Sequence, residues 1–316
     1  MKIGILNEGF LTERHLEALK KLGDLIVFDN TQSEEDAINR LSGLTVAIAD
    51  CLVAPLNKKV LESTDKLELI TLNSTGFERV DVEAAGKKGI KIANVPGYAT
   101  EAVAEHTLAL IIDLSKKIVF SDKKMRQNPF EVDPTEPDKF EEYIGFNLSG
   151  KTLGIIGLGR IGSRVAEISQ AFGVKVIAND ILRIEKEGVE IVSKEKIYKE
   201  SDIISLHVPL TELTANLINK DVLLQMKSNA LIINTARGSI VNDTDLYNVL
   251  KSGIIAGAGL DVVEKYDKSN PLLSLDNVIL TPHSAFYTKE SLENCADIIV
   301  ETVRNFIRGN PINIVS

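Results

Sequence analysis

The sequence predicts an α/β protein with two doubly wound parallel-sheet domains. Two observations support this fold class. Short apolar segments alternate with amphipathic helical patterns along most of the chain, and a glycine-rich turn follows one apolar segment near the middle. Alternation of this kind is typical of parallel sheets that carry helices on both faces. The chain has 316 residues, which is enough for about two domains.

The first hundred residues predict one such sheet. A helical pattern over Glu13–Leu22 places Leu16, Leu19 and Leu22 on one face. Pro96 and Gly97 then interrupt the alternation, and a long helix is expected from Thr100 to Lys124. The predicted strands are Lys2–Leu6, Leu25–Phe28, Val46–Ala49, Leu69–Leu72 and Ile90–Ala93.

A second alternating series begins at Lys151, after a proline-containing segment (127–147, with Pro129, Pro134 and Pro137) that predicts a structured loop or arm. A helix over Lys289–Arg308 and a last strand over Ile312–Val315 close the chain. Six strands fill the second sheet, so the tail is expected to return to the first domain. The domains expected are 1–97 with 286–316, and 98–285. The six strands are Leu153–Ile156, Val174–Ala178, Ile203–His207, Ala230–Asn234, Ile254–Leu260 and Val278–Leu280.

The glycine-rich turn has the spacing of a dinucleotide-binding unit. Gly157, Gly159 and Gly162 lie between the strand ending at Ile156 and a helical pattern over Ser163–Phe172. The first glycine permits a tight turn, the second lets backbone approach a pyrophosphate, and the third lets helix and strand pack closely. Unpaired N–H groups at the helix N-terminus favour an anion. The sequence therefore predicts nucleotide binding.

The acid that follows this unit favours NAD as the cofactor. Asp180 lies 18 residues beyond Gly162, at the end of the next strand. A carboxylate there accepts hydrogen bonds from a ribose diol and repels a 2′-phosphate. Arg160 and Arg183 lie near the same end, which leaves NADP as the alternative.

The amino-acid composition argues against some kinds of binding partner and indicates a cell compartment. The net charge is −9, which argues against a general nucleic-acid or anionic-membrane surface. No apolar run approaches the roughly 18 residues that a membrane span needs, and the chain opens directly on a strand rather than a leader. Cys51 and Cys295 are far apart in sequence, so two unpaired, buried thiols in the cytoplasm are expected.

Two residues that follow strands have the chemistry for carbonyl reduction. His283 comes just after the last strand of the nucleotide domain, and Arg237 follows the strand Ala230–Asn234. The carboxyl ends of such strands face the binding crevice. An imidazole there can protonate a carbonyl oxygen, and a guanidinium fork suits a planar carboxylate. A structural loop histidine and a surface turn arginine are the alternatives.

The other histidines predict less. His207 ends a strand and is expected to line the cofactor groove, His106 to be a packed or capping helix residue, and His15 to lie on an exposed helix face. No His, Cys or carboxylate set has metal-ligand spacing, so no metal is expected. Ser163 and Ser239 have no evident triad partners, which argues against hydrolysis.

Several spaced motifs together resemble one family, the NAD-dependent D-isomer-specific 2-hydroxyacid dehydrogenases. The resemblance extends from end to end of the chain. The motifs are Asn94-Val-Pro-Gly-Tyr, Val103-Ala-Glu-His, Gly157-Leu-Gly-Arg-Ile-Gly, His207-Val-Pro-Leu, Asn234-Thr-Ala-Arg-Gly, Gly259-Leu-Asp-Val and Thr281-Pro-His.

The resemblance implies a Rossmann nucleotide domain plus a flavodoxin-like substrate domain, with substrate in a central cleft and a homodimer built on the nucleotide domains. It implies that Arg237 binds the substrate carboxylate and keto group and that His283 is the catalytic acid/base. The backbone around Thr75 and Gly76 is similar to the family's carboxylate-binding turn. The cofactor-binding residues implied are Gly157, Gly159, Arg160, Ile161, Gly162, Asp180, His207, Val208, Pro209, Thr235, Ala236 and Asp261.

One position departs from the family pattern. The family has a glutamate five residues after the aspartate that matches Asp261, where it hydrogen-bonds the catalytic histidine, and this chain has Tyr266 there. A carboxylate partner stabilises an imidazolium, whereas a phenol gives far less charge stabilisation. Glu264 or Asp267 could take the role if the loop follows a different course.

The function predicted is hydride transfer between NAD(H) and a small 2-keto or D-2-hydroxy acid. D-lactate-like acids, glyoxylate, hydroxypyruvate and 3-phosphoglycerate are the candidate substrates. Phe286 and Tyr287 after His283 are similar to the D-lactate and D-2-hydroxyisocaproate branch. The alternative is an NAD(H)-binding sensor or corepressor-like protein with weak or no turnover, which Tyr266 favours.

Overall fold

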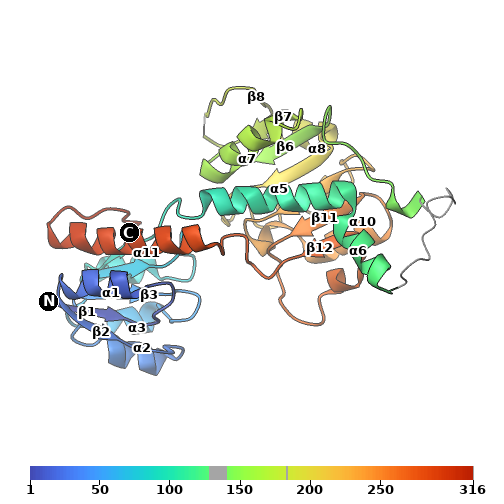
Figure 1. Cartoon of the computed structure of the whole chain (residues 1–316). Helices are drawn as coiled ribbons and strands as arrows, with labels where there is room; N and C mark the ends of the chain where they lie inside the picture. The colour runs from blue at the N-terminus through green and yellow to red at the C-terminus, as the bar shows by residue number, and fades with distance from the viewer. Residues whose placement is uncertain (128–140, 183, 316) are drawn as a thin grey trace. The chain divides into compact units, whose positions relative to one another are not determined.

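The computed structural model describes residues 1–127, 141–182 and 184–315. The chain divides into two compact units (Figure 1). The first unit contains both ends of the chain, Met1–Ala99 and Tyr287–Ser316, and the second contains Thr100–Phe286. None of the helices in the described ranges is long and apolar enough to cross a membrane.

The first unit has a five-stranded parallel sheet in the order β2-β1-β3-β4-β5, which is the flavodoxin-like order. Strands such as β3 are apolar at every position because they are fully buried, so the sequence pattern predicted their bounds closely. The strands are β1 (Lys2–Ile5), β2 (Asp24–Val27), β3 (Val46–Ala49), β4 (Leu69–Leu72) and β5 (Lys91–Ala93). The helices are α1 (Glu13–Lys20), α2 (Glu34–Leu41), α3 (Lys58–Glu62), α4 (Val82–Lys87) and α11 (Lys289–Ile307).

The prediction that His15 lies on an exposed helix face is wrong. Its side chain is 2% exposed, its Nδ1 lies 2.8 Å from Thr12 Oγ1, and its Nε2 lies 3.2 Å from Asp297 Oδ1 on α11. Helix α11 packs beside α1 on the same face of the sheet (Figure 1). The covering helix comes from the far end of the chain, so the local pattern of α1 gave no sign of it.

The last residues belong to the first unit, but they do not form the predicted strand. A single antiparallel bridge joins Ile314 to Ala93, and Val315 N–H donates to Ile92 O at 2.8 Å. Asn313 has φ 60°, and this left-handed conformation interrupts an extended strand.

The second unit has a seven-stranded parallel sheet in the order β12-β11-β10-β9-β6-β7-β8. When the strands are numbered from β6 as the first, β6 to β11 follow the Rossmann order 3-2-1-4-5-6. Strand β12 is one further strand, next to β11. The strand missed by the sequence prediction is β8, a three-residue edge strand with a central glutamate. The strands are β6 (Thr152–Ile156), β7 (Lys175–Asn179), β8 (Val189–Ile191), β9 (Ile203–Leu206), β10 (Leu231–Asn234), β11 (Gly257–Leu260) and β12 (Val278–Leu280).

The predicted long helix over Thr100–Lys124 is two helices. Lys117 has φ 54°, and the Val119 N–H at the start of the second helix donates to Asp113 Oδ1 at 2.8 Å. This side-chain bond stabilises the break, which apolar periodicity does not reveal. The helices of this unit are α5 (Thr100–Lys116), α6 (Ile118–Gln127), α7 (Arg160–Gln170), α8 (Lys194–Glu200), α9 (Lys220–Leu223) and α10 (Asp243–Lys251).

Short 3-10 helices complete the second unit: Glu141–Tyr143, Gly238–Ile240 and Pro271–Ser274. Of the arm predicted at 127–147, residues 128–140 lie outside the described residues, and with them Pro129, Pro134 and Pro137. All seven strands run parallel, so the turns after β6, β7, β9, β10, β11 and β12 meet at one edge of the sheet. The candidate residues of this unit follow those strands.

Candidate active site

The glycine turn after β6 has the shape that its sequence predicts. Gly157 has φ 95°, and a Cβ there would lie 2.5 Å from His207 O at the end of β9. A Cβ on Gly162 would lie 2.0 Å from Gly157 O. A Cβ on Gly159 would meet no atom within 4 Å. Gly157 and Gly162 are therefore required for close packing, whereas Gly159 borders open space.

The helix that follows this turn begins with unpaired donors. The first bond of α7 runs from Ser163 N–H to Gly159 O at 2.9 Å. The N–H groups of Arg160, Ile161 and Gly162 donate to no acceptor within the described residues. Three unpaired N–H groups and the helix dipole stabilise an anion. The residues present therefore fit a dinucleotide pyrophosphate at this turn.

Asp180 ties the glycine turn to the end of β7. Its Oδ2 accepts from Leu158 N–H at 2.6 Å, and its Oδ1 accepts from Leu182 N–H at 2.8 Å. A carboxylate has about four acceptor sites, so capacity for a ribose diol remains. Arg183, which raised the NADP alternative, lies outside the described residues.

His207 lies at the end of β9, next to the glycine turn. Its Nε2 is 2.8 Å from Ser205 Oγ, and burial lowers the pKa of the His207 imidazole to about 4. The ring is therefore neutral at neutral pH, which argues against acid–base chemistry by His207.

We expect His207 to make the fold acid-sensitive. The unfolded chain binds a proton near pH 6.5 and the folded chain only near pH 4, so stability falls as the pH drops through this window. Replacing His207 with Gln should remove about 3 kcal/mol of the stability difference between neutral and acidic pH. Urea unfolding of both proteins at pH values above and below the window measures this. If the wild type and the His207→Gln variant lose equal free energy of unfolding between the two pH values, the prediction is wrong.

Arg237 lies in a tightly held turn after β10. Asn234, which is fully buried, donates from Nδ2 to Arg237 O at 2.9 Å and accepts from Ala236 N–H at 3.0 Å. A Cβ on Gly238 would lie 2.1 Å from Val263 O, so this backbone packs directly against the segment after β11. The half-buried guanidinium of Arg237 donates to Ala236 O at 2.8 Å.

His283 has a left-handed backbone that Asp261 holds in place. The φ of His283 is 56°, which is uncommon for a residue other than glycine. The Asp261 carboxylate, 1% exposed, accepts from Thr281 Oγ1 at 2.5 Å, Ser284 N–H at 2.9 Å and Ala285 N–H at 3.0 Å. His283 N–H donates to Asp261 O at 2.9 Å. Asp261 therefore fixes the turn on both sides of the histidine.

Burial and two charged neighbours set the electrostatics of His283. Burial lowers the pKa of its imidazole, the Asp261 carboxylate raises this pKa, and the Arg237 guanidinium lowers it. The guanidinium thus lies close enough to act on the imidazole, within the same unit. Phe286 packs edge-on against the His283 ring, with the ring centroids 5.7 Å apart.

None of the residues that the structure describes replaces the glutamate partner of His283. Within the described ranges, the His283 ring makes no side-chain hydrogen bond. Tyr266 is 59% exposed, and its hydroxyl accepts from Val263 N–H at 3.3 Å. Glu264 is exposed, and the Asp267 carboxylate accepts from Ser269 N–H at 2.7 Å. Neither carboxylate takes the role that the sequence left open to them.

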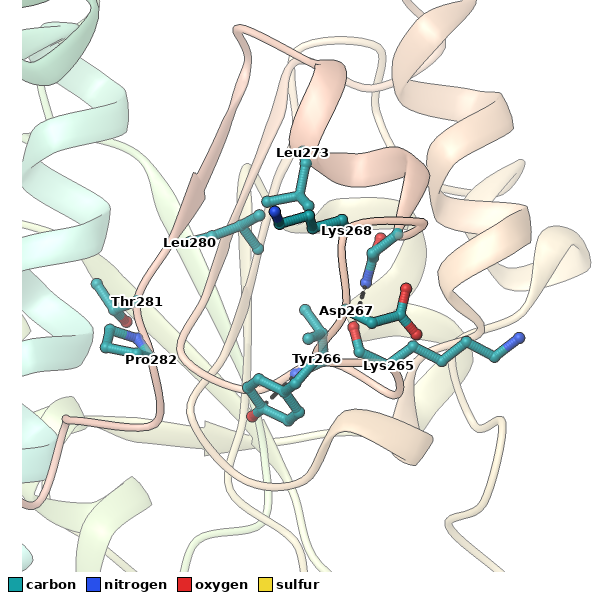
Figure 2. Close-up of a pocket in the computed structure, with 10 residues that line it drawn as sticks. Lys265, Tyr266, Asp267, Lys268, Leu273, Leu280, Thr281 and Pro282 are labelled. Carbon is teal, nitrogen blue, oxygen red and sulfur yellow. Dashed lines mark hydrogen bonds between the residues drawn. The ribbon is translucent and has the colours of Figure 1, made fainter.

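Tyr266 instead lines a cavity of about 370 Å³. Figure 2 shows this cavity between the loop that carries Tyr266 and the segment that leads to His283. The residues that line it are Val263, Lys265, Tyr266, Asp267, Lys268, Asn270, Leu273, Leu280, Thr281 and Pro282.

In the first unit, the turn after β4 presents unpaired donors. The N–H groups of Ser74, Thr75 and Gly76 donate to no acceptor within the described residues. The turn's carbonyl oxygens, in contrast, each accept a hydrogen bond. Their donors are Cys295 Sγ to Asn73 O, Val95 N to Ser74 O, Asn94 Nδ2 to Thr75 O, and Ser74 Oγ to Gly76 O. The turn is therefore suited to an anion such as a carboxylate.

Both thiols lie against this turn. Cys295 is fully buried, and Cys51 Sγ lies 3.5 Å from Ser74 Oγ and 3.6 Å from Gly76 O. Burial raises the pKa of Cys51 and raises that of Cys295 to about 12. The sequence predicted buried thiols but gave no sign of their contact with residues 73–76.

We expect neither thiol to react in the native state. The thiolate is the reactive form, and burial disfavours it. Titration with an aromatic disulfide reagent at mildly alkaline pH should release almost no aromatic thiolate from the native protein. After unfolding in urea, it should release two equivalents of thiolate per chain. One rapidly reacting equivalent in the native protein would contradict the burial of that thiol.

Comparisons with known proteins find matches over most of the chain. The family model described as "D-isomer specific 2-hydroxyacid dehydrogenase, NAD binding domain" matches residues 108–285. A glyoxylate reductase of Korarchaeum cryptofilum is 39% identical over 85% of this chain and 82% of its own length. A hydroxypyruvate reductase of Blautia hydrogenotrophica is 35% identical over 98% of this chain and 97% of its own length. An acyclic imino acid reductase solved with NADPH and D-arginine is 34% identical, with a TM-score of 0.92 over 100% of both chains.

The chain therefore belongs to the D-isomer specific 2-hydroxyacid dehydrogenases. It is an NAD-dependent oxidoreductase with the two parallel-sheet domains of that family. The alternative of a sensor with weak or no turnover receives no support, because these relatives are named as reductases.

Proposed function

We propose that this protein reduces small 2-keto acids to D-2-hydroxy acids, with glyoxylate and hydroxypyruvate as the first candidates. The observation that supports this most is that Arg237 and His283 follow β10 and β12 at the sheet edge that carries the glycine turn, with the Arg237 guanidinium acting on the His283 imidazole. D-lactate-like acids and 3-phosphoglycerate stay as further candidates. A homodimer and a cytoplasmic location stay predictions from the sequence.

In the proposed mechanism, bound NADH supplies the hydride. Arg237 binds the substrate carboxylate and polarises the keto group, and the N–H groups of Thr75 and Gly76 bind the same carboxylate. His283 donates a proton from its ring to the keto oxygen and takes it back in the oxidation direction.

We propose one set of residues to hold NADH. The N–H groups of Arg160 and Ile161 bind the pyrophosphate, and Asp180 binds the adenosine ribose. The remaining residues shape the groove: Gly157, Gly159, Gly162, His207, Val208, Pro209, Thr235, Ala236 and Asp261.

Absorbance assays of NADH oxidation across a substrate panel test the proposal. The panel contains glyoxylate, hydroxypyruvate, pyruvate, 2-ketoisocaproate and 3-phosphohydroxypyruvate, each with NADH and with NADPH. A keto acid mixed with an amine tests C=N reduction, because one structural neighbour reduces imino acids. We expect a D-hydroxy acid product and a preference for NADH. Tight NADH binding without turnover of any compound would overturn the proposal.

A further inference from the structure

A second histidine lies behind the turn that carries His283. His106 is on α5, which packs against β10 and β11 of the same unit. Its Nε2 lies 3.0 Å from Thr281 Oγ1 and 3.6 Å from Asp261 Oδ1. Its side chain is 23% exposed. The sequence predicted a packed or capping residue, and none of the proposed catalytic steps uses it.

The hydrogen bonds around Thr281 have one consistent direction. The Thr281 hydroxyl has one proton, and it donates this proton to the Asp261 carboxylate at 2.5 Å. Its oxygen can then only accept from His106, so His106 Nε2 carries a proton. The order of donation is therefore His106 to Thr281 to Asp261.

We infer that His106 is a positioning residue for His283, acting through Thr281 and Asp261. This inference rests on the proposed role of His283 as the acid/base. The backbone of His283 is left-handed, a conformation that costs about 1–2 kcal/mol for residues with a side chain, so surrounding contacts must hold it. Asp261 supplies those contacts to residues 281, 284 and 285.

The chain of donors also offsets the burial of the Asp261 carboxylate and fixes its orientation. A carboxylate that is 1% exposed needs donors to offset its desolvation. Besides two backbone N–H groups, Thr281 is its side-chain donor, and His106 fixes the Thr281 hydroxyl. The charged groups that act on the His283 ring are Asp261 and Arg237. Because Tyr266 provides no carboxylate, Asp261 is the anionic group that stabilises the imidazolium here.

A pair of His106 variants separates hydrogen bonding from packing. His106→Phe keeps a ring but removes the donor, whereas His106→Gln keeps an N–H donor at the ε position. We expect His106→Phe to lower kcat for keto-acid reduction about tenfold, the upper range for one hydrogen bond, while the affinity for NADH is unchanged. We expect His106→Gln to stay within about threefold of wild type. Equal losses in both variants, or none in either, would overturn the inference.

A double-mutant cycle tests the route through Thr281. Thr281→Val removes the hydroxyl at nearly constant volume. If His106 acts through this hydroxyl, the variant with both changes loses no more activity than the worse single variant. Independent, multiplying losses would overturn the route. Urea unfolding of each variant shows whether the protein is folded under assay conditions.

Nuclear magnetic resonance distinguishes failure of this inference from failure of the proposed function. The chain has 4 histidines, so the His283 ring signals are assigned by comparison with a His283→Asn sample. We expect these signals to shift in His106→Phe and Thr281→Val and to stay near their wild-type positions in His106→Gln. Unchanged signals in all three variants overturn the inference, even where the wild type turns over keto acids. Shifted signals support it independently of turnover.

Discussion

Replacing His283 with asparagine should lower kcat for keto-acid reduction about 10³-fold, within the range that general acid catalysis contributes. Asparagine has no ionisable proton to give to the keto oxygen. It also adopts the left-handed region readily, so the backbone at φ 56° is kept. We expect NADH affinity and the free energy of unfolding to stay near wild type. Stopped-flow and steady-state assays measure the loss, with NADH fluorescence and urea unfolding as controls.

The pH dependence of kcat/KM provides the second measurement of the same prediction. Reduction needs the protonated ring of His283, and burial lowers the pKa of this ring below its ordinary value. Reduction should therefore decline as the pH rises through a value below 6.5, whereas oxidation should gain over the same range. A wild-type pH profile in the His283→Asn variant would show that another group carries the proton.

Replacing Arg237 with lysine should lower kcat/KM for the keto acid by about 10²- to 10³-fold, through loss of the guanidinium fork while the charge is kept. A lysine ammonium cannot donate two parallel hydrogen bonds to a carboxylate. The matched control is Arg126→Lys, in an exposed ion pair with Asp122 on α6. We expect the control to keep wild-type activity. Normal turnover by the Arg237 variant would exclude the proposed carboxylate contact.

The most accurate predictions from the sequence are strands whose apolar residues follow directly from the burial of the strand. Val46–Ala49, Leu69–Leu72 and Val278–Leu280 are strands with the predicted bounds. The errors come from contacts between distant segments or from single backbone angles. β8 is an edge strand of three residues, Lys117 divides the predicted helix, and α11 covers His15.

The same distinction applies to the candidate site. Residues that follow strands, such as Arg237 and His283, could be named because parallel strands end at one edge of a sheet. The contact of His106 with Thr281 spans 175 residues and depends on how α5 packs, so no local pattern reveals it. The surroundings of Tyr266 likewise depend on the course of its loop.

If the turn at residues 73–76 binds the substrate carboxylate as proposed, its hydrogen bonds affect the choice between acids and their derivatives. Its four carbonyl oxygens are already bonded, while three N–H groups have no acceptor within the described residues. Rotation of one of these peptide planes would break the hydrogen bond that its carbonyl oxygen accepts. The N–H groups of the turn are therefore held in their present direction. An ammonium group would meet carbonyl oxygens that each already accept one hydrogen bond, and a neutral ester gains less than an anion. Discrimination against esterified or aminated analogues would thus reside in main-chain atoms, where side-chain substitution does not readily alter it.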